Sequence, residues 1–304
     1  MSTKPPKQVL PKVRLSYSSV DDPLVKRLLI GTIEHATGRK RLERVYSEIK
    51  AQKPTSSQLW DLMLEKLELY PNYVQAQLDK IPKEGPIIFV ANHPFGVVDG
   101  VILGYLASRV RSKFCVLVNE VLCREELLQP YFLPIDFRDT REAKQTNINT
   151  RNETLNRLQA GEALAIFPAG GVATSPKPWA KAEDLDWKRF VIKMILKTKA
   201  TVIPIFVHGQ NSRLFQVASH VSMSLRLSLL LHEVTNKMGR QIYLDIGDPI
   251  PFEQLSNIKD RQELLDHLRA VTFDLRQEHP KTKGKKRRNL RRGRKSRTQA
   301  IPKQ

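Results

Sequence analysis

The chain has 304 residues, a formal net charge of +20 and a mean hydropathy of −0.38. Its length allows one large domain or two small ones, and its 40% hydrophobic and 27% charged residues are typical of a globular protein rather than an integral membrane protein. No apolar run reaches the ~18 residues that span a bilayer. The polar start of the chain does not have the pattern of a secretory signal.

The excess of positive charge is concentrated at the C-terminal end. Twelve Lys or Arg and no acid lie between residues 281 and 303, which leaves +8 of the net charge for the rest of the chain. Such a self-repelling segment with few apolar residues is expected to be disordered over 279–304. Its partner would be anionic, namely nucleic acid, anionic lipid or an acidic protein, unless the segment is only a solubilising or artefactual tail. Because it has no aromatic residues on which bases could stack, the pattern disfavours nucleic acid as a partner.

The N-terminal part is interpreted as a flexible stretch over 1–22 and a helical region over 23–80. Within that region, helices are expected over 23–37, over 42–50 and from Ser56 until Pro71. These helices are amphipathic and basic, which suits an anionic membrane surface. The alternative, equally supported, is that their apolar faces pack on the main domain.

From Tyr73 onward, short strands alternate with helices, and residues 81–278 are assigned to one domain. The expected strands are 73–78, 87–91, 114–118, 163–167, 201–207 and 241–246, and the expected helices are 97–110, 152–159 and 187–196. This alternation predicts an α/β fold with a largely parallel sheet flanked by helices. In such sheets the reactive groups collect beyond the carboxyl ends of the strands.

One polar segment directly follows a predicted buried strand. Asn92 and His93 come after the strand 87–91, and Asp99 lies at the start of the next helix. A loop that turns back from strand to helix can bring the carboxylate of Asp99 against the imidazole of His93. The carboxylate would fix one ring nitrogen and leave the other as a general base. A structural histidine at a strand end is the alternative.

Two further segments carry residues suited to an anionic substrate. Phe167, Pro168, Gly170 and Gly171 follow another buried strand, and the paired glycines allow backbone N–H groups to approach an anion closely. Arg138 follows a short apolar stretch, and arginine suits bidentate binding of phosphate. The alternatives are a tight turn for the glycines and a surface salt bridge for the arginine.

Several other residues allow two interpretations. Pro204 interrupts an apolar strand, and His208 after it either lines the site or is structural. Trp179 and Trp187 flank a polar loop and either dip into a membrane interface or pack in the core. Cys115 lies in an apolar strand and is expected to be a buried thiol rather than a nucleophile. The seven histidines are scattered without a metal-binding spacing, so no metal site is expected.

The order of the conspicuous segments resembles the glycerolipid acyltransferase superfamily, of the lysophosphatidic-acid acyltransferase type. Its successive motifs are matched here by His93 and Asp99, by Arg138, by Phe167, Pro168 and Gly170, and by Pro204. The resemblance covers residues 26–275. It is closest to a bacterial branch of hemolysin-like glycerol acyltransferases that carry Asn-His-Pro-Phe-Gly and Phe-Pro-Ala-Gly motifs.

The resemblance implies an O-acyltransferase that acts peripherally at the inner, cytoplasmic face of the cytoplasmic membrane. His93 would be the base and Asp99 its orienting partner, with acyl-CoA or acyl carrier protein as co-substrate, a lyso-lipid hydroxyl as acceptor, and no cofactor. The implied substrate-binding positions are Asn92, Gly96, Arg138, Phe167, Pro168, Gly170, Gly171 and Pro204. The alternative from another class is a non-catalytic basic protein that binds lipid or nucleic acid.

The sequence departs from the family's pattern at two places. Five residues rather than four separate His93 from Asp99, so the intervening loop must bulge, and Gly96 could supply the bend. Ala169 stands where the usual third motif has a glutamate. This second departure favours a neutral, amino-acid-based or glycolipid acceptor over a glycerol phosphate.

Overall fold

A seven-stranded sheet forms the centre of the fold in the computed structural model, which describes residues 38–277 except residue 178. The strands are β1 (Leu69–Asn72), β2 (Ile87–Ala91), β3 (Phe114–Asn119), β4 (Phe132–Ile135), β5 (Ala163–Ile166), β6 (Thr201–Val207) and β7 (Arg240–Ile246). Their order is β1-β7-β6-β2-β5-β3-β4, and all neighbours are parallel except β6 and β7. The predicted α/β class with a largely parallel sheet is confirmed. The predictions for 1–22, 23–37 and 279–304 lie outside the described residues.

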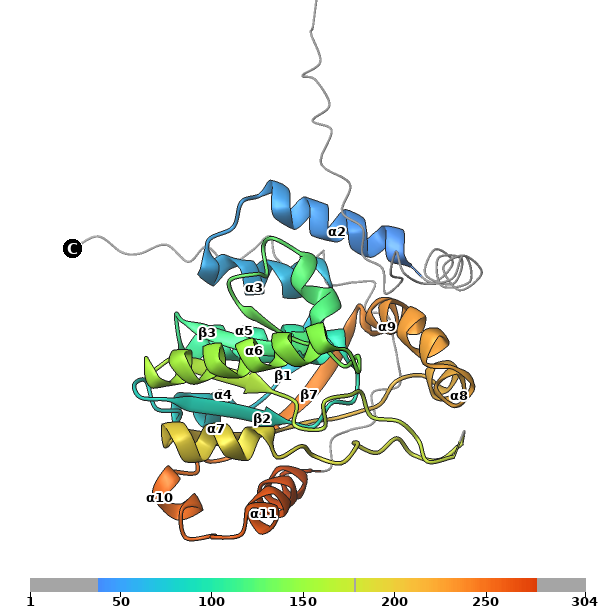
Figure 1. Ribbon diagram of the computed structural model, residues 1–304. Helices are drawn as coiled ribbons and strands as arrows, with labels where there is room; N and C mark the ends of the chain where they lie inside the picture. Colours follow the sequence, from blue (N-terminus) through green and yellow to red (C-terminus); the bar gives the residue numbers. More distant parts are fainter. Residues whose placement is uncertain (1–37, 178, 278–304) are drawn as a thin grey trace, which may run out of the picture.

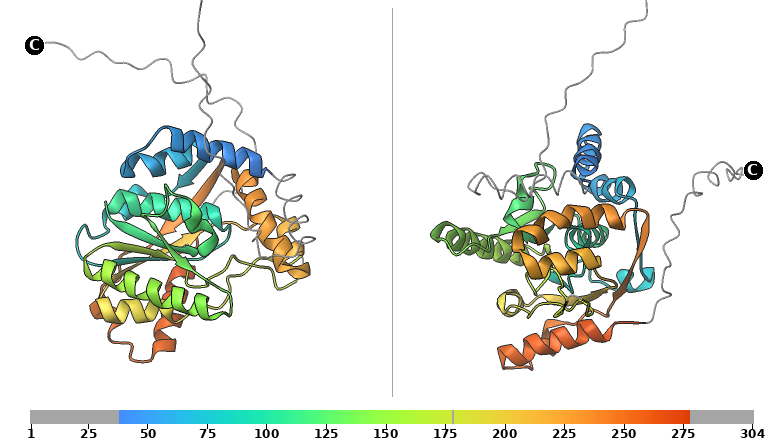
Figure 2. Two further views of the ribbon diagram at one scale, coloured as in Figure 1. Left: turned by 45° about the horizontal axis from the view of Figure 1, so that its top comes forward. Right: turned by 90° about the vertical axis from the view of Figure 1, so that its right-hand side faces the viewer.

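Helices cover both faces of the sheet, and each face has its own apolar core (Figure 1). One face carries α2 (Arg39–Ala51), α3 (Ser56–Lys66) and α5 (Val97–Val110), and the other carries α6 (Arg141–Gln159), α7 (Phe190–Thr198), α10 (Phe252–Leu255) and α11 (Arg261–Asp274). The views in Figure 2 show α8 (Arg213–Val221) and α9 (Met223–Lys237) at one end of the sheet. Strands β2 and β5 are buried along their whole length because both faces are covered.

The N-terminal helices that the structure describes pack on the main domain. The ring of Trp60 in α3 is fully buried against Gly104 of α5, where an added Cβ would lie 2.1 Å from the ring. Helix α2 buries Leu42, Tyr46 and Ile49 in the same core. The packing interpretation therefore holds for these two helices. In the described part of the chain, no helix combines the length and the apolar character needed to cross a bilayer.

The strand expected over 73–78 is wrong. The edge strand β1 lies at 69–72, where it pairs with β7, and the short helix α4 (Gln75–Asp79) follows it. Pro71 therefore lies within β1 instead of ending a helix, which an edge strand tolerates because one of its sides needs no N–H donors. In α4 only Leu78 is buried, so the apparent alternation did not reflect a buried sheet face.

Other boundaries differ where the local pattern was weak. Helix α6 begins at Arg141 rather than at 152, because the hydroxyl of Thr140 accepts the N–H of Ala143 at 3.2 Å and caps the helix there. Strand β4 and the helices α8 to α11 were not predicted. Helix α9 illustrates the difficulty, because its leucines surround the helix and mark no single apolar face.

Candidate active site

Three loops meet at the carboxyl edge of the sheet. Strand β2 lies between its parallel neighbours β5 and β6, so the loops that follow these strands emerge side by side. His93 lies in the loop after β2, Phe167 begins the loop after β5, and His208 begins the loop after β6.

His93 and Asp99 form a hydrogen-bonded pair. Nδ1 of His93 lies 3.0 Å from Oδ2 of Asp99, a residue in the first turn of α5. The same carboxylate oxygen accepts the N–H groups of Phe95 and Gly96 at 2.7 and 2.9 Å. The Asp99 side chain is fully buried, whereas the His93 side chain is 15% exposed. Asp99 thereby holds one ring nitrogen and leaves Nε2 for a substrate.

Gly96 makes the five-residue spacing possible. Its φ of 93° belongs to the region that L side chains rarely adopt, and it turns the loop into α5. An added Cβ would lie 3.0 Å from Leu230 and 3.2 Å from Val172, so the neighbouring side chains also leave little room. The bulge expected from the spacing is thus built at Gly96, and it brings Asp99 back to His93.

The third motif packs directly on the histidine. The ring of Phe167 stacks on the imidazole of His93, with ring centroids 3.9 Å apart and planes inclined by 16°. Gly170 has a φ of 68° and donates its N–H to the carbonyl of Phe167 at 2.9 Å, which closes a tight turn. The N–H of Gly171 finds no acceptor within the described part of the chain. Pro168 accepts the N–H of Lys188 at 2.8 Å, so the turn is tied to the start of α7.

Two of the predicted substrate-binding residues instead form hydrogen bonds that join strands of the sheet. The buried amide of Asn92 donates to the carbonyl of Val207 at 2.9 Å and accepts the N–H of Val207 at 2.6 Å. Pro204 lies in the buried centre of β6, and its carbonyl accepts the N–H of Gly247 at 2.9 Å. These contacts hold the end of β2 against β6 and the end of β7 against β6.

Arg138 forms salt bridges with two nearby acidic side chains. Its guanidinium donates to Asp136 at 2.6 Å and to Glu120 at 3.0 Å. The side chain of Asp136 is buried, and the guanidinium beside it holds the pKa of that carboxyl well below its usual range. This is the salt-bridge interpretation of Arg138, since a substrate phosphate would compete with two carboxylates.

The loop between β5 and α7 supplies a carboxylate that the motifs did not reveal. Oδ1 of Asp184 accepts the backbone N–H of His93 at 2.9 Å, and Oδ2 accepts the indole N–H of Trp187 at 3.0 Å. Asp184 is separated from His93 by 91 positions, so no local spacing connects the two residues. Trp187 is buried, as the core-packing interpretation expects, whereas Trp179 of the same loop is 76% exposed.

A buried ion pair of α9 lies beside the first motif. The ammonium of Lys237 is 4.7 Å from the centroid of the Phe95 ring and 3.6 Å from a carboxylate oxygen of Glu233. Burial lowers the pKa of Lys237. The ammonium group also donates a hydrogen bond to the carbonyl of Gln210 at 3.0 Å. Glu233 also accepts the N–H of Ser212 at 3.1 Å. The pair fixes a positive and a negative charge together at the edge of the site.

Two further groups have structural surroundings. His208 contacts Asp245 of β7 through Nε2, and Asp245 accepts the N–H of Gln277 at 3.1 Å. This contact ties the end of β6 to β7 and to the segment after α11, in keeping with the structural interpretation of His208. Cys115 is buried in β3, and burial raises the pKa of its thiol to about 12.

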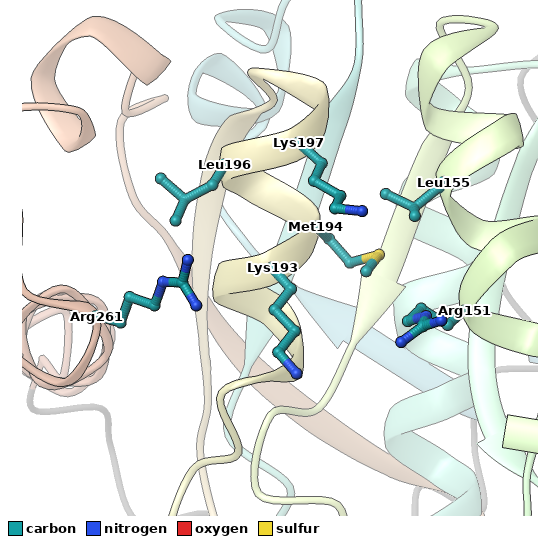
Figure 3. A pocket seen from close by; sticks show the side chains of 7 residues that line it. All are labelled: Arg151, Leu155, Lys193, Met194, Leu196, Lys197 and Arg261. Carbon is teal, nitrogen blue, oxygen red and sulfur yellow. The ribbon is translucent and has the colours of Figure 1, made fainter. Parts of the chain in front are cut away.

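A cationic groove lies on the outer helical layer between α6, α7 and α11 (Figure 3). The groove has a volume of about 240 Å³ and is lined by Arg151, Leu155, Lys193, Met194, Leu196, Lys197 and Arg261. Its lining therefore combines four positively charged side chains with three apolar ones and includes no acidic side chain. Within residues 38–277, apart from 178, no cluster of His, Cys, Asp or Glu is suited to hold a metal ion.

Comparison with known proteins places this site in a family. Residues 69–280 match the family model described as Acyltransferase. A lyso-glycine lipid O-acyltransferase from Bacteroides thetaiotaomicron is 29% identical over 206 residues, which are 65% of this chain and 73% of the relative. The protein of the same name from Phocaeicola vulgatus is 27% identical over 209 residues, 65% of this chain and 71% of the relative.

Among solved structures, the crystal structure of the 1-acyl-sn-glycerophosphate acyltransferase PlsC from Thermotoga maritima matches with a TM-score of 0.43 and 14% identity, over 82% of this chain and 95% of that chain. The family model covers more than half of the present chain, and its range includes His93, Asp99 and Asp184. The family model confirms the acyltransferase membership that the resemblance implied. The chain belongs to the acyltransferase family.

Proposed function

We propose that the protein transfers a fatty acyl group from an acyl thioester of coenzyme A or acyl carrier protein to a hydroxyl of a lyso-lipid. The observation that carries this proposal is the 3.0 Å contact between Nδ1 of His93 and Oδ2 of Asp99. It favours the tautomer with the proton on Nδ1, so that the lone pair of Nε2 can accept a proton. A protein that only binds lipid has no need of a buried carboxylate that orients a histidine in this way.

The site supports direct transfer by addition and elimination. Nε2 of His93 takes the proton of the acceptor hydroxyl while its oxygen attacks the thioester carbonyl carbon, and Asp99 balances the charge of the resulting imidazolium. When the tetrahedral adduct collapses, the carbon–sulfur bond breaks and the proton passes from His93 to the leaving sulfur. The products are an ester and a thiol. We assign the N–H of Gly171, which has no acceptor among the described residues, as a backbone donor to the developing oxyanion.

We propose an amino-acid-based lyso-lipid as the acceptor. Ala169 stands where the lysophosphatidic-acid type has a glutamate, and it is buried in the apolar core that also contains Trp187. Arg138, the other predicted phosphate ligand, donates to Asp136 and Glu120. Both similar relatives are named for a lyso-glycine lipid, which supports an amino-acid head group on the acceptor.

The proposed action at a membrane surface rests on exposed apolar side chains around the site. An added Cβ would lie 3.6 Å from Phe137 at Gly170 and 2.9 Å from Leu185 at Gly171, so these two exposed side chains border the glycine pair. Trp179 is also exposed, and tryptophan prefers the bilayer interface. Exposed apolar groups that gather at one place mark an interaction surface. Because acyl thioesters are cytoplasmic compounds, we place the protein peripherally at the inner face of the cytoplasmic membrane.

The test is acyl transfer by the purified full chain beside His93→Ala. Acyl-CoA and acyl carrier protein would each be offered with lyso-glycine lipid, lysophosphatidic acid and monoacylglycerol. We expect ester formation on the amino-acid lipid and a loss of roughly 10²–10⁴-fold in the variant. His267→Ala is the matched control, because His267 is an exposed residue of α11.

Two other outcomes would change the proposal. Equal transfer by His93→Ala and the wild type would remove His93 from the chemistry. Transfer to none of the acceptors, with both proteins still binding vesicles, would leave a non-catalytic lipid-binding protein as the better description.

A further inference from the structure

Asp184 connects the catalytic loop to a rigid part of the core. One carboxylate oxygen accepts the N–H of His93 at 2.9 Å, and the other accepts the indole N–H of Trp187 at 3.0 Å. The Trp187 ring is buried in the same apolar core as Val191 and Ile195 of α7. The carboxylate is therefore fixed at both oxygens, and one of its anchors belongs to a packed core.

The segment that carries Asp184 is itself held against the site. Thr174 and Glu183 exchange backbone hydrogen bonds of 2.9 and 3.1 Å, which fold the loop after β5 back on itself. Ala173 donates its N–H to the carbonyl of His93 at 2.8 Å. His93 is thus held by its backbone N–H and its carbonyl from the same loop, while Asp99 holds its ring.

The charges around His93 make a second carboxylate useful. Glu233 and Lys237 of α9 form a pair of their own, which balances those two charges. Asp99 of α5 contacts the ring of His93 itself, and Asp184 of the loop interacts with the charge of His93 from its main-chain side. Burial raises the pKa of Asp184, and the hydrogen bonds from His93 and Trp187 and the charge of His93 act in the opposite direction. Both oxygens accept hydrogen bonds from N–H donors, which is the arrangement that suits an ionised carboxylate.

We propose that Asp184 is a positioning residue of the acyl-transfer site, which fixes the main chain of His93 and supplies a second negative charge that stabilises its protonated ring. The positioning role rests on the proposed function of His93 as the base. Asp184 acts through His93 and contacts no reacting atom. The geometry also explains why the loop after β5 returns to the first motif before it enters α7.

The experiment follows the ring of His93 by NMR titration in the full chain labelled with ¹³C-histidine, because this readout needs no turnover. His93→Ala assigns the signal. Asp184→Asn keeps one acceptor oxygen and removes the charge, so the midpoint of the His93 titration is expected to fall by about half a pH unit or more. Glu183→Gln is the matched control, because Glu183 is exposed and meets Thr174 only through its backbone. A midpoint that stays in place in Asp184→Asn would overturn the proposal.

Steady-state kinetics test the two proposed effects of Asp184, the positioning of His93 and the stabilisation of its protonated ring. Asp184→Asn is expected to lower kcat by roughly tenfold with little change of KM, and to move the acidic limb of the pH–rate profile to lower pH. Because the amide of that variant also meets the indole N–H of Trp187, Asp184→Asn would be repeated with Trp187→Phe, which removes the opposing donor. A wild type that transfers no acyl group would contradict the proposed function, and the NMR midpoint would still report on Asp184.

A third variant covers the case in which Asp184→Asn does not fold. Asp184→Glu keeps the charge and displaces the acceptor oxygen by one methylene, so the NMR midpoint should stay close to that of the wild type while kcat falls roughly tenfold. An unchanged kcat in this variant would overturn the positioning role.

Discussion

The imidazole of His93 lies face to face with the ring of Phe167, with centroids 3.9 Å apart and planes inclined by 16°. The hydrogen bond to Asp99 fixes one nitrogen of the imidazole, and the stacked ring of Phe167 fixes the plane in which Nε2 points. We expect Phe167→Leu to lower kcat by roughly 2- to 10-fold, which corresponds to the ~0.5–1.5 kcal/mol of an aromatic pair. Steady-state rates at saturating acyl donor would measure the effect.

A second aromatic pair provides the control for this prediction. Phe114 stacks on Tyr131 with centroids 5.0 Å apart, at the start of β3 and so at the edge of the sheet opposite the site. Phe114→Leu should lower the unfolding temperature and leave kcat unchanged. Equal losses of kcat in the two variants would show that the stacking on His93 has no specific part in catalysis.

Asp99 is the partner whose charge matters most for the ring. Its Oδ2 accepts three hydrogen bonds, while its buried Oδ1 has no partner within the described residues. Asp99→Asn preserves the size of the side chain but removes the charge that balances the imidazolium. We therefore expect kcat to fall roughly 10²–10⁴-fold, with circular dichroism unchanged. A variant that keeps more than about a tenth of the wild-type rate would contradict the assigned role of Asp99.

The sequence predicted the parts of the site that lie within one strand, loop and helix. His93 and Asp99 belong to a single such unit, so their spacing alone allowed the contact to be expected, and Gly96 was identified as the bend. Asp184 could not be found in this way, because it reaches His93 from 91 positions away through a loop without regular structure. Arg138 was chosen for its chemistry, and only the fold revealed the acids around it.

Trp179 is expected to contribute to membrane binding. Its side chain is 76% exposed in the loop that leads from Gly171 to Asp184, and Lys177 and Lys181 flank it in the sequence. Burial of one large aromatic side chain at the bilayer interface is worth ~2 kcal/mol, so Trp179→Ala should weaken binding to vesicles by roughly tenfold or more. Sedimentation with vesicles that contain anionic lipid would measure the binding constant.

Two comparisons show whether this effect is local to the site. Tyr70→Ala removes an exposed ring from the edge strand β1 and is expected to leave vesicle binding unchanged. Charge reversal at Lys193 and Lys197 tests the cationic groove of Figure 3 as the alternative membrane-facing surface. A larger loss from charge reversal than from Trp179→Ala would move the membrane contact from the site to the groove.

Neither cysteine is expected to take part in the reaction. Burial raises the pKa of Cys115 to about 12 and that of Cys123 to about 11. At pH 8 both thiols therefore stay protonated, whereas the thiolate is the reactive form. Iodoacetamide at this pH should leave the rate of acyl transfer unchanged, and Cys115→Ala should retain activity. Rapid inactivation by the reagent, together with a loss of activity in Cys115→Ala, would instead indicate a thiol intermediate.

Arg138 should affect stability in a pH-dependent way. The guanidinium holds the pKa of Asp136 below the ordinary value of 3.8, so ionised Asp136 stabilises the fold above about that pH, and this contribution is lost as the pH falls further. Arg138→Gln should therefore lower the free energy of unfolding at pH 7, and the difference from the wild type should shrink toward pH 3. Urea unfolding across this range would measure it. Lys144→Gln, which removes an exposed pair with Asp139, is the control and should have little effect. An increase of KM in Arg138→Gln at pH 7 with no change in stability would instead favour the phosphate-binding role expected from the motif.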